Sequence, residues 1–350
     1  MNIDTYLIRL LLRWSSRIIF GIMLASGYPC AGSEAIPEEI TSLSLSTIDC
    51  IYKEDLGKAT EEAKKIIRKY PENPAGYFFM AVVLDSWMQL HQSNLKENEF
   101  YQYCDLAIEK GENLLAKDPK DEWAKFFIGG ADGYKGTYEA RYERWITAFR
   151  YGWKGVSVLL ELQSKGSGLV DINYGIGNYD YWRSAMMKIL WWMPGIDDKR
   201  EEGIKKILIT MDKGVYTKVA SSVSLISIMM NEKRFDEALA ISEKMLRIYP
   251  ESSFFLWGKV NALIALKRYK EAVEILFVIK KKLDKDPRDN EYNGVVCHYW
   301  LAKSYYSLGL YSDAIAQCDE MNSYELTPDI RKRLEKFFSD AASIRKKSLK

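Results

Sequence analysis

Apolar and polar positions recur with a regular spacing in the last third of the chain. An aromatic residue, two mostly charged residues and an alanine occupy 235–238, return 34 residues later at 269–272, and return again after 42 residues at 311–314. A mostly apolar stretch with helical periodicity precedes each copy, as at 299–308. A period of 34 residues is typical of a helix–turn–helix unit that buries its apolar faces only by stacking on its neighbours. The pattern therefore predicts consecutive helix hairpins.

Turn signals separate the two helices that we expect in each unit. They lie at 231–234, 266–268 and 308–310, directly before the aromatic position. Small residues follow at Ala238, Ala272 and Ala314, where the second helix of each unit must approach the first. Each unit thus has the pattern that a close antiparallel hairpin requires.

The same register continues upstream, with gaps. Ala59, Ala63 and Pro71 fit the second helix of an early unit, and counting on from Pro119 reaches Ile128 and Gly129 at the expected apolar and small-residue positions. We therefore expect N-terminal repeats over 41–120, degenerate aromatic- and glycine-rich helical repeats over 121–214, and regular repeats over 215–327. A capping helix is expected over 328–350, where the end of the chain is polar and basic.

These positions resemble the tetratricopeptide-repeat family over about 41–350. In the last unit Leu301, Ala302, Tyr305, Tyr311 and Ala314 match the family consensus, while His298 takes the place of its large first residue. Larger residues also replace the consensus small residue in the two preceding units, at Ile226 and Val260. The resemblance implies an all-α fold, a right-handed superhelical array of about seven antiparallel helix hairpins with a C-terminal cap helix. The middle of the chain is similar to exported bacterial repeat proteins of undefined activity.

The resemblance also implies a concave groove, lined by the first helix of each unit, that accepts a peptide or a partner helix. Counting inward-facing positions yields nine residues: Val223, Ser227, Met230, Trp257, Asn261, Ile264, Tyr299, Lys303 and Tyr306. Among these, the aromatic rings and hydrogen-bonding groups best suited to hold a peptide are the candidate partner-binding residues: Trp257, Asn261, Tyr299, Lys303 and Tyr306. The family's clamp for C-terminal carboxylates needs more Lys, Arg and Asn than this chain offers, so that specificity is not expected here.

A second candidate surface lies in the middle of the chain. Residues 123–192 contain six of the ten tryptophans, among them Trp182, Trp191 and Trp192. We expect most of these rings to fill the core between irregular repeats. An apolar surface or pocket for a ligand, a partner or a membrane is the alternative, with these three tryptophans as its candidate residues.

The N-terminus predicts export. An arginine-bearing leader runs into eight apolar or small residues at 18–25, too few to span a bilayer, and small residues follow. We interpret residues 1–32 as a cleaved secretory signal peptide, with a retained N-terminal anchor as the alternative. The expected location is the periplasm or cell envelope of a bacterium. Cys30 does not fit a lipid-modification site, because Pro29 precedes it directly.

Charge and residue chemistry exclude several functions. Outside the first thirty residues the chain carries 47 basic and 47 acidic residues, so it lacks the positive field that binding to nucleic acid requires. It has two histidines, His91 and His298, and no closely spaced cysteine pair, so we expect no metal site, no cofactor and no enzymatic activity. Cys297 and Cys318 are expected to be free thiols, with a bridge between them left open.

Glycines at 129, 133 and 136 lack the spacing of a phosphate-binding loop. Their spacing matches one stripe of a helix, which predicts close packing against a neighbouring helix.

Three functions fit these observations. The first is a non-catalytic scaffold or adaptor of the cell envelope that binds a protein or peptide in the groove. The second is a carrier of a hydrophobic or glycan ligand in the aromatic middle. The third is an accessory subunit of an envelope enzyme or transporter complex. Membrane contact is expected only through an uncleaved N-terminus or the aromatic middle.

Overall fold

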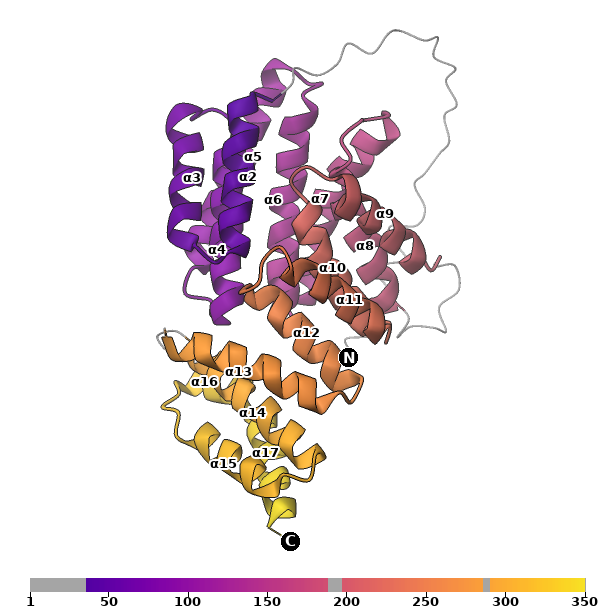
Figure 1. Ribbon diagram of the computed structural model, residues 1–350. Helices are drawn as coiled ribbons and strands as arrows, with labels where there is room; N and C mark the ends of the chain where they lie inside the picture. Colours follow the sequence, from indigo (N-terminus) through magenta and orange to yellow (C-terminus); the bar gives the residue numbers. More distant parts are fainter. Residues whose placement is uncertain (1–35, 188–196, 286–289, 350) are drawn as a thin grey trace, which may run out of the picture. The chain divides into compact units, whose positions relative to one another are not determined.

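The computed structural model describes residues 36–187, 197–285 and 290–349, and this part of the chain is entirely helical outside its turns. Sixteen helices lie in these ranges (Figure 1): α2 (Glu38–Tyr52), α3 (Leu56–Lys69), α4 (Pro74–His91), α5 (Glu97–Lys117), α6 (Glu122–Arg141), α7 (Trp145–Ser164), α8 (Ile172–Met187), α9 (Arg200–Lys213), α10 (Lys218–Asn231), α11 (Phe235–Leu246), α12 (Ser253–Ala265), α13 (Tyr269–Lys285), α14 (Glu291–Ser307), α15 (Tyr311–Asn322), α16 (Pro328–Arg333) and α17 (Glu335–Ser348). The expected all-α fold is confirmed. The predicted signal peptide, Trp191 and Trp192 lie outside the described residues.

The helices pack as consecutive hairpins, from α2 with α3 to α14 with α15. This makes seven hairpins within the described residues, in agreement with the expected number of repeats. The C-terminal cap consists of two helices, the six-residue α16 and the longer α17, which packs against both α14 and α15.

The helix that opens the turn ends in the same way in six of the hairpins. One residue in each turn adopts a left-handed conformation, with φ between 50° and 62° for the non-glycine residues and 76° for the glycine. The next backbone N–H then donates to the carbonyl five residues earlier, as Arg268 does to Leu263 at 2.8 Å. This pattern resembles the hydrogen bonding that ends many helices in a left-handed residue. The six left-handed residues are Glu54, Gln92, Glu143, Lys233, Lys267 and Gly309.

Side-chain caps explain where several helices begin. Asp55, Asn73, Asp121 and Thr327 precede α3, α4, α6 and α16, and each side chain accepts a hydrogen bond from a backbone N–H of the first turn. Proline is the first residue of both α4 and α16, a position where its missing N–H costs nothing. The side-chain cap thus defines the start of α3 and of α6, whereas cap and proline together define the starts of α4 and α16.

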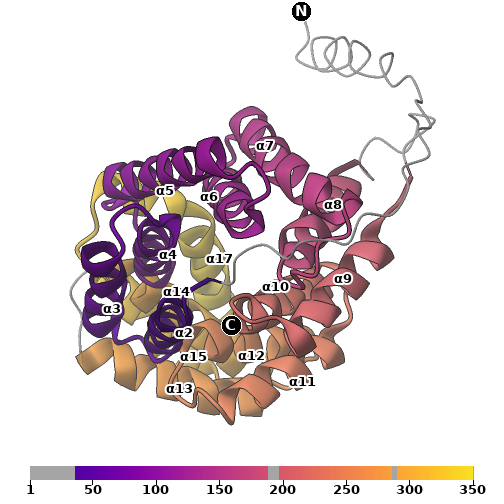
Figure 2. The same ribbon diagram turned by 90° about the horizontal axis from the view of Figure 1, so that it is seen from above.

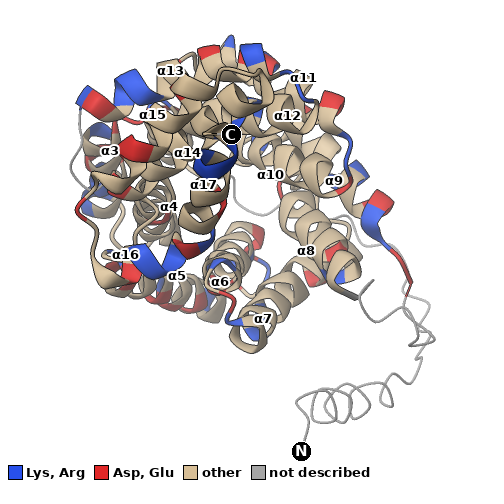
Figure 3. Ribbon diagram, turned by 90° about the horizontal axis from the view of Figure 1, so that it is seen from below, with Lys and Arg blue, Asp and Glu red and all other residues tan. Residues whose placement is uncertain are grey.

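The first helices of the later hairpins carry far fewer charges than the second helices. α10 and α12 each have a single charged residue, Lys218 and Lys259. Their partners α11 and α13 carry four and eight, and Figure 3 marks charged positions in blue and red along the ribbons of α11 and α13. A helix that is mostly apolar around its circumference is a buried helix. The first helices are therefore the inner ones.

Glycines bring α6 and α7 into backbone contact. A Cβ atom on Gly155 would lie 2.6 Å from the carbonyl oxygen of Gly129, and one on Gly136 would lie 2.9 Å from the amide nitrogen of Gly152. Gly177 and Gly203 make the same kind of approach between α8 and α9. The predicted close packing is confirmed for Gly129 and Gly136, whereas a Cβ on Gly133 would meet nothing within 4 Å.

The first hairpin lies against repeats far along the sequence. Thr41 Oγ1 is 3.0 Å from the hydroxyl of Tyr216, and the ring of Tyr52 stacks on that of Phe255 with centroids 5.8 Å apart. Glu54 accepts hydrogen bonds from Ser253 and Lys282. Figure 2 shows the helices of residues 36–349 arranged around a common axis. The first hairpin thus closes the array on itself rather than ending it.

Membrane spans, metal-ligand clusters and the two C-terminal cysteines can be examined in the described residues. No described helix is long and apolar enough to cross a membrane. No three potential ligands among the histidines, cysteines and carboxylates of the described ranges lie close enough to hold a metal ion. Cys297 and Cys318 are buried free thiols whose sulfur atoms contact the carbonyl oxygens of Leu276 and Ala341.

Candidate functional site

A cavity of about 890 Å³ lies on the inner side of the helix array. Its walls come from the C-terminal end of α4, the first helices α10, α12 and α14, the start of α13 and one residue of α17. The inner cavity, as we call it, is therefore built from four hairpins that span more than half the chain, together with the cap. Its aromatic walls include Phe254, Trp257, Tyr292, Trp300 and Phe337.

Three of the predicted partner-binding residues line the inner cavity. Trp257 and Asn261 stand one helical turn apart on α12, and Lys303 faces them from α14. Every inward position predicted on α10 and α12 lies in the wall as well. The register inferred from the repeats therefore describes these two helices correctly.

Two polar groups of the wall are free to meet an occupant. The Asn261 side chain is exposed and makes no hydrogen bond to any described residue. The Lys303 ammonium has no carboxylate within 4.0 Å in the described ranges and lies 4.8 Å from the ring centroid of Trp300. Such a cation held over an aromatic ring keeps its hydrogen-bond donors available. The wall thus offers both an amide and a cation to an occupant.

The charge of the inner cavity has one sign. Among the residues that the structure describes, its lining includes Lys267 and Lys303 but no aspartate or glutamate. Burial raises the pKa of Tyr292, which stays a neutral hydrogen-bonding group at physiological pH. An occupant with a carboxylate or another anionic group is therefore favoured over a cationic one.

The predicted position of Tyr299 in the groove requires correction. Its side chain is only 5% exposed and packs edge-on against Phe337 of α17, with ring centroids 4.9 Å apart. Burial, followed by the nearby Asp340, raises the pKa of Tyr299 to about 12. Val296 and Trp300 occupy the wall instead. The cap helix covers the face of α14 that the repeat register assigns to the groove, so Tyr299 is a packing residue.

Tyr306 and Trp182 also lie away from the inner cavity. Tyr306 packs against Tyr311 across the turn of the last hairpin, with ring centroids 5.7 Å apart. Trp182 is on α8, 39% exposed, and meets the ring of Tyr181 edge-on. The two candidate surfaces are thus separate parts of the molecule.

The end of α4 joins the first repeats to the last and forms one margin of the inner cavity. Asn293 Nδ2 donates to the Leu90 carbonyl at 2.6 Å, and an Arg333 guanidinium nitrogen donates to the Gln92 carbonyl at 2.6 Å. The Arg333 guanidinium also lies 4.6 Å from the ring centroid of Tyr292. Local periodicity carries no signal for these contacts, because they join residues about 200 positions apart.

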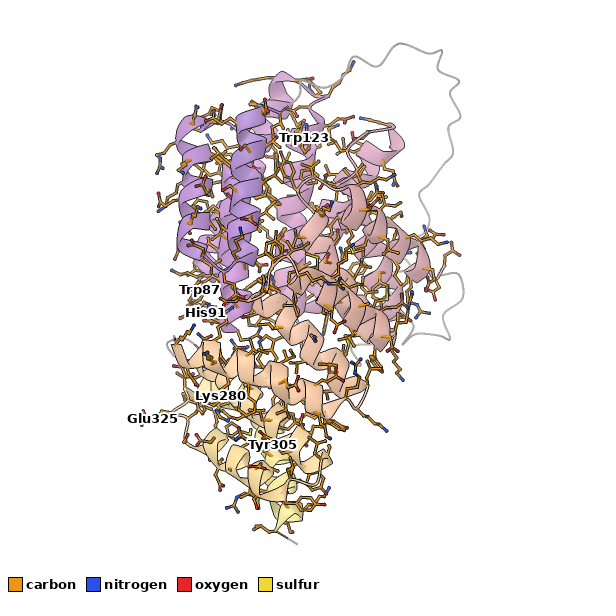
Figure 4. The ribbon with its side chains drawn as sticks, in the orientation of Figure 1. Trp87, His91, Trp123, Lys280, Tyr305 and Glu325 are labelled. Atoms are coloured by element: carbon orange, nitrogen blue, oxygen red, sulfur yellow. The ribbon has the colours of Figure 1, made fainter. Side chains whose placement is uncertain are left out.

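Neither histidine has the surroundings of a catalytic base. His91 is half-buried on Trp87 near the end of α4 (Figure 4), where the ring centroids lie 4.4 Å apart in a stacked arrangement. His298 is 4% exposed, and its Nδ1 lies 2.8 Å from Gln317 Oε1. His298 is therefore a packed core residue.

Comparison with known proteins agrees with the repeat interpretation. Residues 229–288 match the family model of the tetratricopeptide repeat. No curated protein matches the sequence.

Two solved structures resemble the fold loosely. The first is a tetratricopeptide repeat protein from Parabacteroides merdae ATCC 43184, with 15% identity, a TM-score of 0.37, and coverage of 87% of this chain and 100% of that one. The second is the TPR domain of P58(IPK), with 13% identity, a TM-score of 0.28, and coverage of 89% and 99%. The family-model match over residues 229–288, together with the hairpin architecture of the described residues, confirms the expected resemblance to the tetratricopeptide-repeat family.

Proposed function

We propose that this chain is a non-catalytic scaffold or adaptor that binds a peptide or helix of a partner protein in the inner cavity. The observation that carries the proposal is the wall shared by Trp257, Asn261 and Lys303, an aromatic ring with an unused amide and an unused cation. An amide pairs with a peptide backbone, the cation with a carboxylate, and the rings with an apolar side chain. The absence of acidic residues from the wall favours a partner segment that carries acidic groups.

A displayed library of random peptides tests this proposal. We expect selection against the wild-type protein to enrich peptides that combine an apolar or aromatic residue with an acidic one. Trp257→Ala combined with Lys303→Glu should weaken their binding about 30-fold, because anchors of this kind are worth about 2 kcal/mol. Circular dichroism and the melting temperature must show that the variant stays folded.

Matched substitutions elsewhere provide the control. Lys270→Glu reverses a charge on the exposed side of α13, and Trp145→Ala removes an exposed tryptophan from α7. Both should leave peptide binding unchanged. The proposal is wrong if no peptide is enriched, or if the enriched peptides bind the folded double variant as tightly as the wild type.

The volume of the inner cavity favours a second candidate, the carriage of a small apolar ligand. Its 890 Å³ fall within the range of small-molecule sites, and its walls are rich in aromatic rings. Native mass spectrometry of the purified protein decides between the two. A co-purified small molecule that is lost from Trp257→Ala supports the carrier, whereas protein without added mass leaves the peptide-binding proposal as the better one.

We also propose that the chain acts in the cell envelope. Support comes from the arginine-flanked apolar stretch at 18–25 in the sequence. Cell fractionation with N-terminal sequencing tests this, and a chain recovered from the cytosol with Met1 intact would contradict it.

A further inference from the structure

A continuous apolar surface covers the first half of α7 and the adjoining part of α8. On α7 it consists of large residues at helical spacing, and on α8 a second row runs beside them. Tyr179 joins the rows, since its ring centroid lies 6.0 Å from those of both Phe149 and Trp153. We call this surface the aromatic face; its residues are Trp145, Ile146, Phe149, Trp153, Tyr179, Trp182 and Met186.

The aromatic face is much more exposed than a core surface. Trp145, Phe149 and Trp153 are 48%, 43% and 44% exposed, and Ile146 is 72% exposed. Trp145, Phe149, Trp153 and Trp182 together expose roughly 350 Å² of side-chain surface, if a free aromatic side chain exposes about 200 Å². Apolar patches of this size on a single chain are often functional surfaces.

Unpaired cations flank the aromatic face. Arg150 is exposed on α7 beside the row, and the Arg183 guanidinium on α8 lies 5.9 Å from the ring centroid of Tyr179. Neither arginine has an ion pair with any residue in the described ranges. The neighbouring carboxylates Asp132 and Asp180 are buried and face Lys154 and Lys206. Two free positive charges therefore border an apolar surface whose carboxylate neighbours within these helices are paired.

We propose that the aromatic face docks on the surface of an anionic lipid bilayer. Tryptophan, tyrosine and arginine are the side chains that anchor proteins at the boundary between headgroups and acyl chains. Trp145, Ile146 and Phe149 would enter that boundary, while Arg150 and Arg183 meet lipid phosphates. The charge distinguishes this occupant from an apolar protein surface, because it complements anionic headgroups. The proposal is independent of the inner cavity.

Vesicle flotation with the full-length chain tests the proposal. Vesicles of phosphatidylcholine alone are compared with vesicles that also contain phosphatidylglycerol. We expect preferential binding to the anionic vesicles, weakened by added salt. Trp145→Ser, Phe149→Ser and Trp153→Ser together should lower the partition coefficient at least tenfold. Ile146→Asp should lower it several-fold, and its side chain is exposed enough that folding is not at risk.

The matched control is Phe277→Ser with Val278→Ser on α13, two apolar residues that are 48% and 46% exposed elsewhere. This control variant should bind vesicles as the wild type does. The proposal is overturned if the wild type binds neither vesicle, or if Ile146→Asp and the triple variant bind like the wild type. It is also overturned if light scattering shows a wild-type dimer that the triple variant abolishes, because a second copy then covers the face.

Discussion

The regular repeats α10–α13 and the irregular middle α6–α9 build the same hairpin in two different ways. In the regular repeats the helices meet through alanine, and Ala238 and Ala272 are both fully buried. In the middle they meet through glycine, where the Gly155 Cα approaches the backbone of α6 so closely that no Cβ would fit. An alanine contact leaves a methyl group between the helices and a glycine contact leaves nothing. The middle therefore has less tolerance for change at its helix contacts.

The close contact also changes where the large side chains go. In the regular repeats Phe255 is fully buried and Trp257 faces the inner cavity. In the middle, helices in backbone contact leave little space between them, and Trp145 and Trp153 lie outward, nearly half exposed. The first helix α12 of the regular region thus presents Trp257 inward, whereas the second helix α7 of the middle presents Trp145 and Trp153 outward.

Among the substitutions that test this comparison, Gly155→Ala is expected to lower the free energy of unfolding the most. Its Cβ would lie 2.6 Å from the Gly129 carbonyl oxygen and 2.8 Å from the Gly133 amide nitrogen, both backbone atoms of a helix. Neither can move unless α6 and α7 separate, so we expect the free energy of unfolding to fall by about 3 kcal/mol. Urea unfolding followed by circular dichroism measures this loss.

Gly133→Ala is the matched control on the facing helix. A Cβ at this position would meet nothing within 4 Å, so the substitution should gain up to about 1 kcal/mol of helix propensity. If both variants are stabilised, α6 and α7 are not in backbone contact. The contrast between the two regions then disappears.

The sequence predicts the regular region well because its signals are local. The aromatic and alanine positions repeat with the hairpin, and the turn residues directly precede them, so helix order follows from spacing. The inward faces of α10 and α12 follow from the family resemblance that these positions carry. In the middle the same argument finds the glycine stripe, but an exposed apolar surface remained only the alternative, and Trp182 is the one residue of the aromatic face named for it. Periodicity cannot show whether a large residue on a tightly packed helix points into the array or away from it.

The inner cavity was predictable only where one helix decides the outcome. Trp257 and Asn261 follow from the register of α12, whereas Tyr299 was assigned wrongly because α17 packs on that side of α14. The contact between Leu90 and Asn293 at the margin of the inner cavity could not be predicted, because it forms only when the whole array closes. Local spacing contains no information about either contact.

Ala272→Gly is the reciprocal substitution, with a smaller expected effect. It should lower the free energy of unfolding by about 1.5 kcal/mol, from lost helix propensity and one lost buried methyl group. Ala240→Gly, at an exposed position of α11, provides the reference because it loses propensity without burial. If the two variants lose the same stability in urea, the Ala272 methyl group contributes nothing to the hairpin contact.

The smallest expected effect is the loss of folding stability at acidic pH that comes from the ion pairs of Glu161. Glu161 on α7 accepts hydrogen bonds from Lys165 at 2.6 Å and from the largely buried Lys125 of α6 at 2.9 Å, and these contacts lower its pKa to about 2. A pKa lowered by folding adds stability above the unfolded value of about 4.5, and this stability is lost as the pH falls from there towards 2. Since the carboxylate is 46% exposed, we expect less than about 1 kcal/mol.

Glu161→Gln should therefore flatten the acid limb of stability against pH, measured as melting temperature between pH 5 and about 2.5. Glu271→Gln is the control from the regular region, since Glu271 pairs with Arg268 inside a single exposed turn and joins no two helices. We expect that variant to follow the wild type closely, because an exposed pair within one turn is weakened by solvent and by the entropy of two long side chains. The opposite result, a change with Glu271→Gln alone, would mean that local pairs in the regular repeats carry the acid sensitivity. Contacts between the helices of the middle would then contribute none of it.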